Sequence, residues 1–120
     1  MYIQGFIVPV PENNRDDYIA AAKKGWSIFK SMGALEMVEA WEEDVADGKL
    51  TDFRKAVQIQ PGEKVVFSWI MWPDRATCDA AGEKMQKDPA MEESFGEMPF
   101  DGNRMFWGGF SPVFNSRGLS

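Results

Sequence analysis

The stretch YIQGFIVP, residues Tyr2–Pro9, is echoed near the other end of the chain by FWGGFSP, residues Phe106–Pro112. Both stretches are apolar at alternate positions, both contain Gly-Phe, and both stop at a proline. Alternation with a period of two is the pattern of a β-strand, and a proline marks where a strand leaves its ladder. Apolar strands in these two places, with helical patterns between them, predict a sheet in which the first and last strands pair.

The composition indicates one globular domain that carries more aromatic surface than it can bury alone. The chain has 120 residues, of which 44% are hydrophobic, with five Trp, nine Phe and eight Met. A domain of this size has room for one core. We therefore expect part of the aromatic surface to be buried in a homodimer; the alternative is that large side chains fill the core.

Charge and missing residue types exclude several classes of protein. With 19 acidic and 13 basic residues the net charge is −6, which disfavours binding to nucleic acid or to a membrane surface. The chain has no histidine, so the usual general base and the common ligands of zinc and haem iron are missing, and we expect neither metal nor cofactor. A single cysteine, Cys78, and the lack of a signal-peptide pattern are typical of a cytoplasmic protein.

Periodicity and breaker residues predict the order βαββαβ. The expected elements are a strand over residues 2–10, a helix capped by Asn13 or Asn14 and stopped by Gly33, strands over residues 34–42 and 65–72, a helix from its cap Asp74 to Asp88-Pro89, and a last strand after an Asp101-Gly102 turn. Residues 43–63 form a long loop and residues 91–100 a looser segment. We expect an α+β, ferredoxin-like domain over residues 1–114, an antiparallel sheet with two helices on one face, and a tail over residues 115–120.

The stretch Val65–Trp72 is apolar on both faces of the expected strand. A strand with this pattern is covered on both sides in a folded protein. Helices of a domain this small cover one face only, so the other face is expected to meet the sheet of a second copy.

Two clusters contain candidate catalytic carboxylates, Glu39 and Asp52. Glu39 shares a strand face with apolar residues, where desolvation would raise its pKa towards that of a general base; the alternative is that it protects an edge strand from unwanted pairing. Asp52-Phe53-Arg54-Lys55 can hold a polar substrate through Asp52 and Arg54, or can form an ion pair that fixes the long loop with Phe53 in the core.

Other candidates each have a functional and a structural interpretation. Asp101 and Arg104 flank the last turn and either reach into a cleft or pair with each other. Four tryptophans line either an apolar pocket or a dimer core: Trp41, Trp69, Trp72 and Trp107. The acidic residues between 36 and 47 lack the spacing of a calcium loop and are interpreted as a solvated face, and Cys78 as a small packed residue.

Several short motifs occur in a characteristic order: MYIQGF at 1–6, DGK at 47–49 with TDFR at 51–54, VFSWI at 66–70 with WPD at 72–74, and MPFDG at 98–102 with RM at 104–105 and GGF at 108–110. Together they resemble the domain of unknown function 1428 family, the YbaA-like proteins, over residues 1–114. Two positions depart from the family pattern: Asn103 stands where a lysine is expected and Trp107 where a tyrosine is expected. These departures weaken the case for an anion site at the last turn but not the case for the fold.

This resemblance implies the dimeric α/β-barrel superfamily, in which two ferredoxin-like sheets face each other. It implies no particular reaction, because the superfamily includes cofactor-free monooxygenases, isomerases, stress-response proteins and haem-binding proteins. Because the chain has no histidine, it cannot bind haem iron through a histidine ligand.

Three hypotheses for the function remain open. The first is a small homodimer that binds an apolar or aromatic small molecule. Its expected polar contacts are Glu39, Asp52, Arg54, Asp101 and Arg104, and its expected aromatic contacts are Trp41, Trp69 and Trp107. The second is a cofactor-free monooxygenase or isomerase, in which Glu39 or Asp52 removes a proton and Arg54 or Arg104 stabilises the enolate. The third is a protein that only mediates assembly. The sequence alone leaves open whether the protein is an enzyme.

Overall fold

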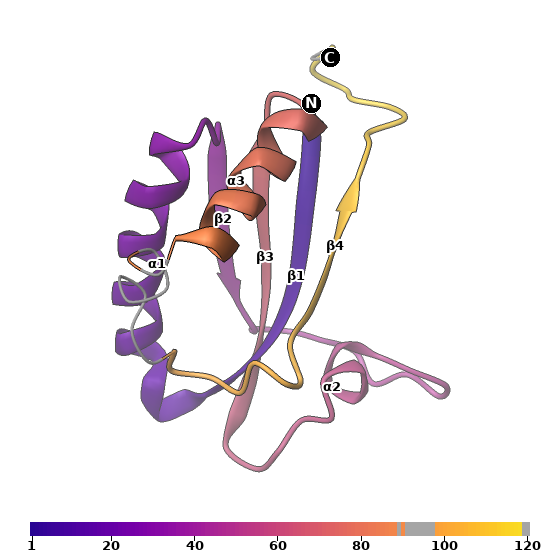
Figure 1. Ribbon diagram of the computed structural model, residues 1–120. Helices are drawn as coiled ribbons and strands as arrows, with labels where there is room; N and C mark the ends of the chain where they lie inside the picture. The colour runs from indigo at the N-terminus through magenta and orange to yellow at the C-terminus, as the bar shows by residue number, and fades with distance from the viewer. Residues whose placement is uncertain (89, 91–97, 119–120) are drawn as a thin grey trace.

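The computed structural model describes residues 1–88, 90 and 98–118. The elements are, in chain order, β1 (Tyr2–Pro11), the 3-10 helix η1 (Glu12–Asn14), α1 (Arg15–Ser31), β2 (Glu36–Trp41), α2 (Phe53–Ala56), β3 (Glu63–Trp72), α3 (Arg75–Lys87) and β4 (Phe106–Phe110). Figure 1 shows β1 and β3 side by side as the two long strands in the middle of the sheet. The expected end of the second helix at Pro89 and most of the expected loose segment, residues 91–97, lie outside the described residues.

The described strands form one antiparallel sheet in the order β2-β3-β1-β4. β1 pairs with β4 in a register that places Ile3 opposite Phe110 and Phe6 opposite Trp107. The predicted pairing of the two echoed stretches is therefore confirmed, and so is an antiparallel α+β architecture. β2 and β4 lie at the edges of the sheet, so each presents one unpaired side of its backbone.

The helix boundaries match the sequence patterns in two places and differ in a third. Gly33 follows α1 with φ of 104°, the left-handed stop that the sequence predicts. The Asp74 carboxylate accepts a hydrogen bond from the Thr77 backbone N–H and caps α3 as predicted. The predicted side-chain cap of α1 is wrong, because the Asn14 side chain instead donates to the carbonyl oxygen of Pro99, 3.1 Å away.

The core lies on one face of the sheet, which we call the inner face: the even-numbered positions of β1 and β3. Val8, Val10, Val66, Ile70 and Trp72 of this face are buried. Helix α1 packs here through Tyr18 and Phe29, and α3 through Cys78 and Ala81. Trp72 is 1% exposed, meets Phe29 edge-on, and donates its indole N–H to Gln4 across the β1–β3 pair.

The opposite face, which we call the outer face, carries large apolar side chains that the described chain leaves uncovered. Phe67 of β3 is 46% exposed, and Phe106 and Phe110 of β4 are 46% and 60% exposed. β3 is therefore apolar on both faces, as the sequence indicates, yet only its inner face is fully covered within one chain.

Residues 43–63 are more ordered than the predicted long loop. They contain α2, whose first residue, Phe53, meets Phe67 of the outer face edge-on. Phe53 is 45% exposed, so its expected burial in the core is wrong. Val57, directly after α2, is instead the buried anchor, with 1% exposure.

Candidate functional site

An open cavity of about 410 Å³ lies between α1 and the inner face of the sheet. It exists because α1 presents Ala21, Ala22 and Gly25 towards the sheet, and these small residues leave space that larger ones would fill. The other described residues that line it are Phe6, Val8, Tyr18, Phe29, Met37, Glu39, Ser68, Ile70, Met85, Met98, Phe100, Gly102 and Met105. Walls of this kind, mostly aromatic and aliphatic with a few polar groups, are typical of small-molecule sites.

The polar groups of this cavity gather at Glu39, on edge strand β2. The Tyr18 hydroxyl donates a 2.7 Å hydrogen bond to the Glu39 carboxylate, and Ser68 forms a second side-chain hydrogen bond with it. Tyr18 and Ser68 are buried, at 7% and 3% exposure. Glu39 itself stays accessible, because it also lines a second cavity. The three side chains form what we call the Glu39 corner.

The Glu39 corner has the electrostatics that the sequence predicts for a desolvated carboxylate. Burial raises the pKa of the Glu39 carboxyl above its ordinary value, and the hydrogen bonds from Tyr18 and Ser68 oppose that rise. Burial and the adjacent carboxylate also raise the pKa of the Tyr18 hydroxyl. The phenol proton therefore stays on Tyr18, and the carboxylate is the group that can accept a proton.

The second cavity, of about 510 Å³, lies between α1 and β2 on the other side of the Glu39 corner. Its wall is more polar and includes Arg15 and Lys23 of α1 as well as Glu36. The Arg15 guanidinium lies over the Trp41 ring, 5.7 Å from its centroid. Trp41, which the sequence predicts at a ligand site, thus lines this second cavity, and its ring contacts the Arg15 guanidinium there.

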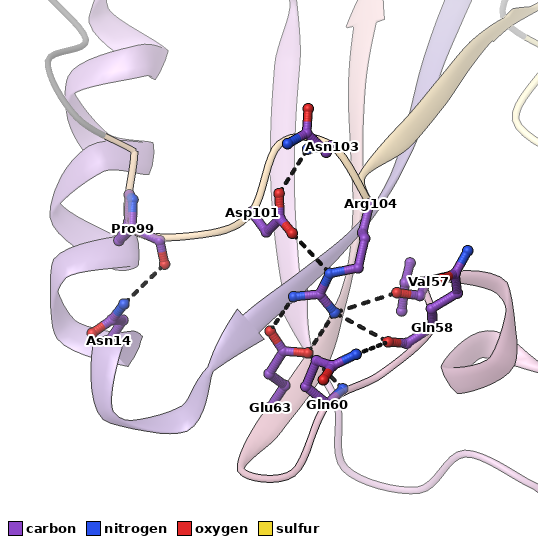
Figure 2. A network of polar contacts seen from close by, with 9 residues as sticks. All are labelled: Asn14, Val57, Gln58, Gln60, Glu63, Pro99, Asp101, Asn103 and Arg104. Carbon is purple, nitrogen blue, oxygen red and sulfur yellow. Dashed lines mark hydrogen bonds and ion pairs between the residues drawn. The ribbon is translucent and has the colours of Figure 1, made fainter.

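Asp101 and Arg104 belong to a network of polar contacts (Figure 2). Arg104 Nε donates to Asp101 at 2.9 Å, and its two terminal nitrogens donate to the Glu63 carboxylate at 2.7 and 2.6 Å. The backbone carbonyl oxygens of Val57 and Gln58 accept further hydrogen bonds from the same guanidinium. Arg104 thus joins the turn before β4 to the segment between α2 and β3, and its donors are occupied by protein acceptors.

A hollow of about 690 Å³ adjoins this network and shares Ala21, Met98 and Phe100 with the 410 Å³ cavity. Asp101 and Arg104 lie beside it, near the mouth of the cavity but not on its wall. The alternative that these two side chains pair with each other matches the observed contacts.

Asp52 and Arg54 lie away from the cavity, on α2 and its cap. The Asp52 carboxylate accepts backbone hydrogen bonds from Lys55 and Gly48, which lower the pKa of the Asp52 carboxyl. Arg54 pairs with Glu42, which also accepts a hydrogen bond from the Val65 backbone. These contacts fix the 43–63 segment, so the ion-pair interpretation of this cluster describes the geometry better than a substrate site.

The remaining tryptophans do not share one pocket. Trp72 is in the core, while Trp69 lies on the outer face, where it meets Phe67 and donates its indole N–H to Glu36. Trp107 lies at the β4 edge, 61% exposed, and stacks on Phe6.

Cys78 is buried, and burial raises the pKa of its thiol, as fits a packed residue. Within the described ranges, no group of three or more acidic or cysteine side chains is arranged to hold a metal ion. Of the acidic stretch, Glu36, Glu39 and Glu42 are each hydrogen-bonded to a protein donor.

Sequence reasoning found Glu39 but missed its partners and Glu63. Tyr18 lies within the helical pattern before Gly33, and nothing in the sequence around it indicates the partner of its hydroxyl, although a buried tyrosine usually finds one. Ser68, the one polar residue between Val65 and Trp72, is a signal that could point to the cavity.

The order of the strands and helices defines the class of protein as ferredoxin-like. Two solved structures described as dimeric ferredoxin-like proteins from an uncultured marine organism match the chain with TM-scores of 0.64 and 0.55. Their sequence identities are 8% and 13%; the matches cover 96% and 95% of this chain and 97% of each of those chains. At such low identity the likeness shows the fold alone.

The chain belongs to the family described as "Protein of unknown function (DUF1428)", which matches residues 1–102. It is 51% identical over 115 residues to the uncharacterized protein YbaA of Escherichia coli strain K12 and to that of Shigella flexneri. Each match covers 95% of this chain and 97% of the relative. The family resemblance carried by the short motifs is therefore confirmed. Among the described helices, none is both long and apolar enough to cross a membrane.

Replacing Arg104 by methionine is expected to destabilise the protein by about 2 kcal/mol at pH 7, because Glu63, whose side chain is 8% exposed, loses its cation. Arg104 lowers the pKa of the Glu63 carboxyl below its ordinary value of 4.5. The stabilisation by the ion pair is therefore complete above pH 4.5 and is lost as the pH falls through the lowered pKa of Glu63. Urea unfolding at several pH values measures the difference. Arg75→Met, which breaks an exposed pair, is the control and is expected to change little. Equal effects of the two variants would contradict the role of the network.

Replacing Glu39 by glutamine is expected to raise the melting temperature at pH 7. The raised pKa means that the folded protein binds the Glu39 proton more tightly than the unfolded chain, so the charged carboxylate opposes folding once the pH exceeds 4.5. The gain is expected to shrink as the pH falls towards 4.5, where wild-type Glu39 becomes protonated. Differential scanning calorimetry from pH 4 to 8 tests this, with the exposed Glu43→Gln as control. A lower melting temperature for Glu39→Gln at pH 7 would show that the charge stabilises the fold.

Proposed function

We propose that this protein is a cytoplasmic homodimer that binds an apolar or aromatic small molecule in the 410 Å³ cavity between α1 and the sheet. The observation that carries the proposal is the wall of this cavity, in which aromatic and methionine side chains surround one polar corner. Glu39 and Ser68 are the proposed polar contacts. Of the candidates that the sequence suggested, Glu39 alone is retained, because Trp41, Asp52, Arg54, Trp69, Asp101, Arg104 and Trp107 do not line this cavity.

The exposed outer face supports the homodimer. Phe67 of β3 and Phe106 of β4 lie on either side of Ile7 of β1, which pairs with both. With Phe110, and with Phe53 at the α2 end, they form an apolar surface on the outer face. A contiguous exposed apolar patch of this kind usually marks an interface. The two structurally similar proteins are described as dimeric. We infer that the outer face of a second copy covers this outer face. Helices α1 and α3 of each subunit then lie on the inner face of its own sheet, as in an α/β barrel made by two chains.

The Glu39 corner also favours a second candidate, a cofactor-free monooxygenase or isomerase. An accessible carboxylate with a raised pKa is suited to remove a proton from a bound substrate. Such a reaction develops negative charge that needs a donor or a cation, and in the described part of the wall no lysine or arginine supplies one. Binding without turnover is therefore the better-supported function.

The ligand site is tested by filling it. Ala22 lines the cavity, whereas Ala20 lies two positions earlier in α1 and is exposed, so Ala22→Phe and Ala20→Phe add the same side chain to the same helix. A thermal-shift screen of aromatic metabolites against the wild type is expected to give saturable rises in melting temperature. These rises should persist in Ala20→Phe and disappear in Ala22→Phe. Hits that survive Ala22→Phe, or a screen without hits, would argue that the cavity is not a binding site.

The homodimer is tested by placing a charge on the outer face. Phe67→Lys puts an ammonium group at the middle of the apolar surface, and burying it in an interface would cost several kcal/mol. We expect sedimentation velocity to show a dimeric wild type and a folded, monomeric Phe67→Lys. Leu50→Lys, at a 98% exposed position off the sheet, is the control and should remain dimeric. A monomeric wild type, or a Phe67→Lys variant that stays dimeric, would refute this interface.

A further inference from the structure

We infer that the ligand of the cavity is an arylalkylamine, an aromatic ring system with an aliphatic amine, held by an ion pair between its ammonium group and the Glu39 carboxylate. This inference rests on the proposed function and adds the chemical class of the ligand. It follows from the charges, the hydrogen bonding and the shape of the site, taken in turn.

The charge of the cavity is one-sided. Among the described residues that line it, Glu39 is the ionised group, and no lysine or arginine accompanies it. The second cavity, which Glu39 also lines, contains two cations: Arg15, which lies over Trp41, and Lys23. The whole chain carries a net charge of −6. A carboxylate in such surroundings attracts a cationic ligand and repels an anionic one.

The hydrogen bonds of Glu39 leave capacity for a ligand. A carboxylate offers about four lone-pair positions, and the contacts from Tyr18 and Ser68 use two of them. Both donors hold the carboxylate in place between α1 and β3, so its orientation is set before a ligand arrives. An ammonium group that donates to a remaining position forms a charge-assisted hydrogen bond and compensates the desolvation of the carboxylate.

The rest of the wall fits an aromatic body attached to that ammonium group. Phe6 of β1, Phe29 of α1 and Phe100, in the segment before β4, all line the cavity. Met37 and Met105 add flexible thioethers, which make favourable contacts with aromatic rings and adapt to their shape. A planar bicyclic ring system is small enough for a cavity of 410 Å³.

Three probes with one skeleton separate this inference from the proposed function: 2-naphthylmethylamine, 2-naphthylmethanol and 2-naphthoic acid. They are cationic, neutral and anionic at neutral pH. Titration calorimetry with the wild-type protein is expected to give binding about tenfold tighter for the amine than for the alcohol, and weakest for the acid. Glu39→Gln is expected to reduce amine affinity to that of the alcohol and to leave alcohol affinity unchanged. Glu43→Gln, which removes the same charge from an exposed position outside the cavity, should change neither.

The outcomes distinguish the two claims. An alcohol that binds as tightly as the amine, or an amine preference that survives in Glu39→Gln, overturns the inference and leaves the proposed binding function in place. If the acid binds most tightly of the three probes, the inference is likewise overturned and the proposed binding function stays in place. If none of the three probes binds, or if Ala22→Phe leaves their binding intact, the proposed function fails and the inference fails with it.

Discussion

The antiparallel pairing of β1 with both β3 and β4 is the interaction on which the rest of the structure depends. It brings residues separated by about the whole length of the chain into register, Ile3 beside Phe110 and Phe6 beside Trp107. The inner face of β1 supplies Phe6 and Val8 to the floor of the cavity. Because β1 is flanked on both sides, β2 and β4 become the edges, and the turn before β4 is placed where Arg104 can reach Glu63.

The cavity follows from this sheet and from the choice of small residues on one side of α1. A helix that presented leucine in place of Ala21, Ala22 and Gly25 would pack directly onto Phe6 and Ile70 and close the space. The chain instead leaves a carboxylate, Glu39, partly desolvated beneath the helix, held by Tyr18 and Ser68. A carboxylate with a raised pKa that two donors hold in place is a feature of functional sites more often than of structural cores.

The sequence predicts the parts of this structure that rest on local rules. The left-handed Gly33 and the Asp74 cap follow from patterns within a few residues, and so does the alternation that marks each terminal strand. The pairing of β1 with β4 follows from the likeness of two distant stretches. The cap of α1 is wrong because a distant carbonyl, that of Pro99, competes for the Asn14 side chain. The Arg104–Glu63 ion pair joins positions 41 residues apart, and no local sequence pattern predicts it. The sequence shows Glu39 as a charged residue on an apolar strand face. The cavity beside it depends on how α1 packs on the sheet, which is decided by tertiary structure and not by a local pattern.

The central claim, that the cavity under α1 binds an aromatic molecule, is tested most directly by NMR of methyl-labelled methionine. Met37, Met85, Met98 and Met105 line the cavity, whereas Met71 lies on β3 at an outer-face position. On titration with 2-naphthylmethylamine we predict saturable shifts of the cavity methyl signals, while the Met71 signal stays in place. Unchanged cavity signals, or shifts confined to Met71, would contradict the account, because the molecule would then leave the cavity empty or bind to the outer face of the sheet.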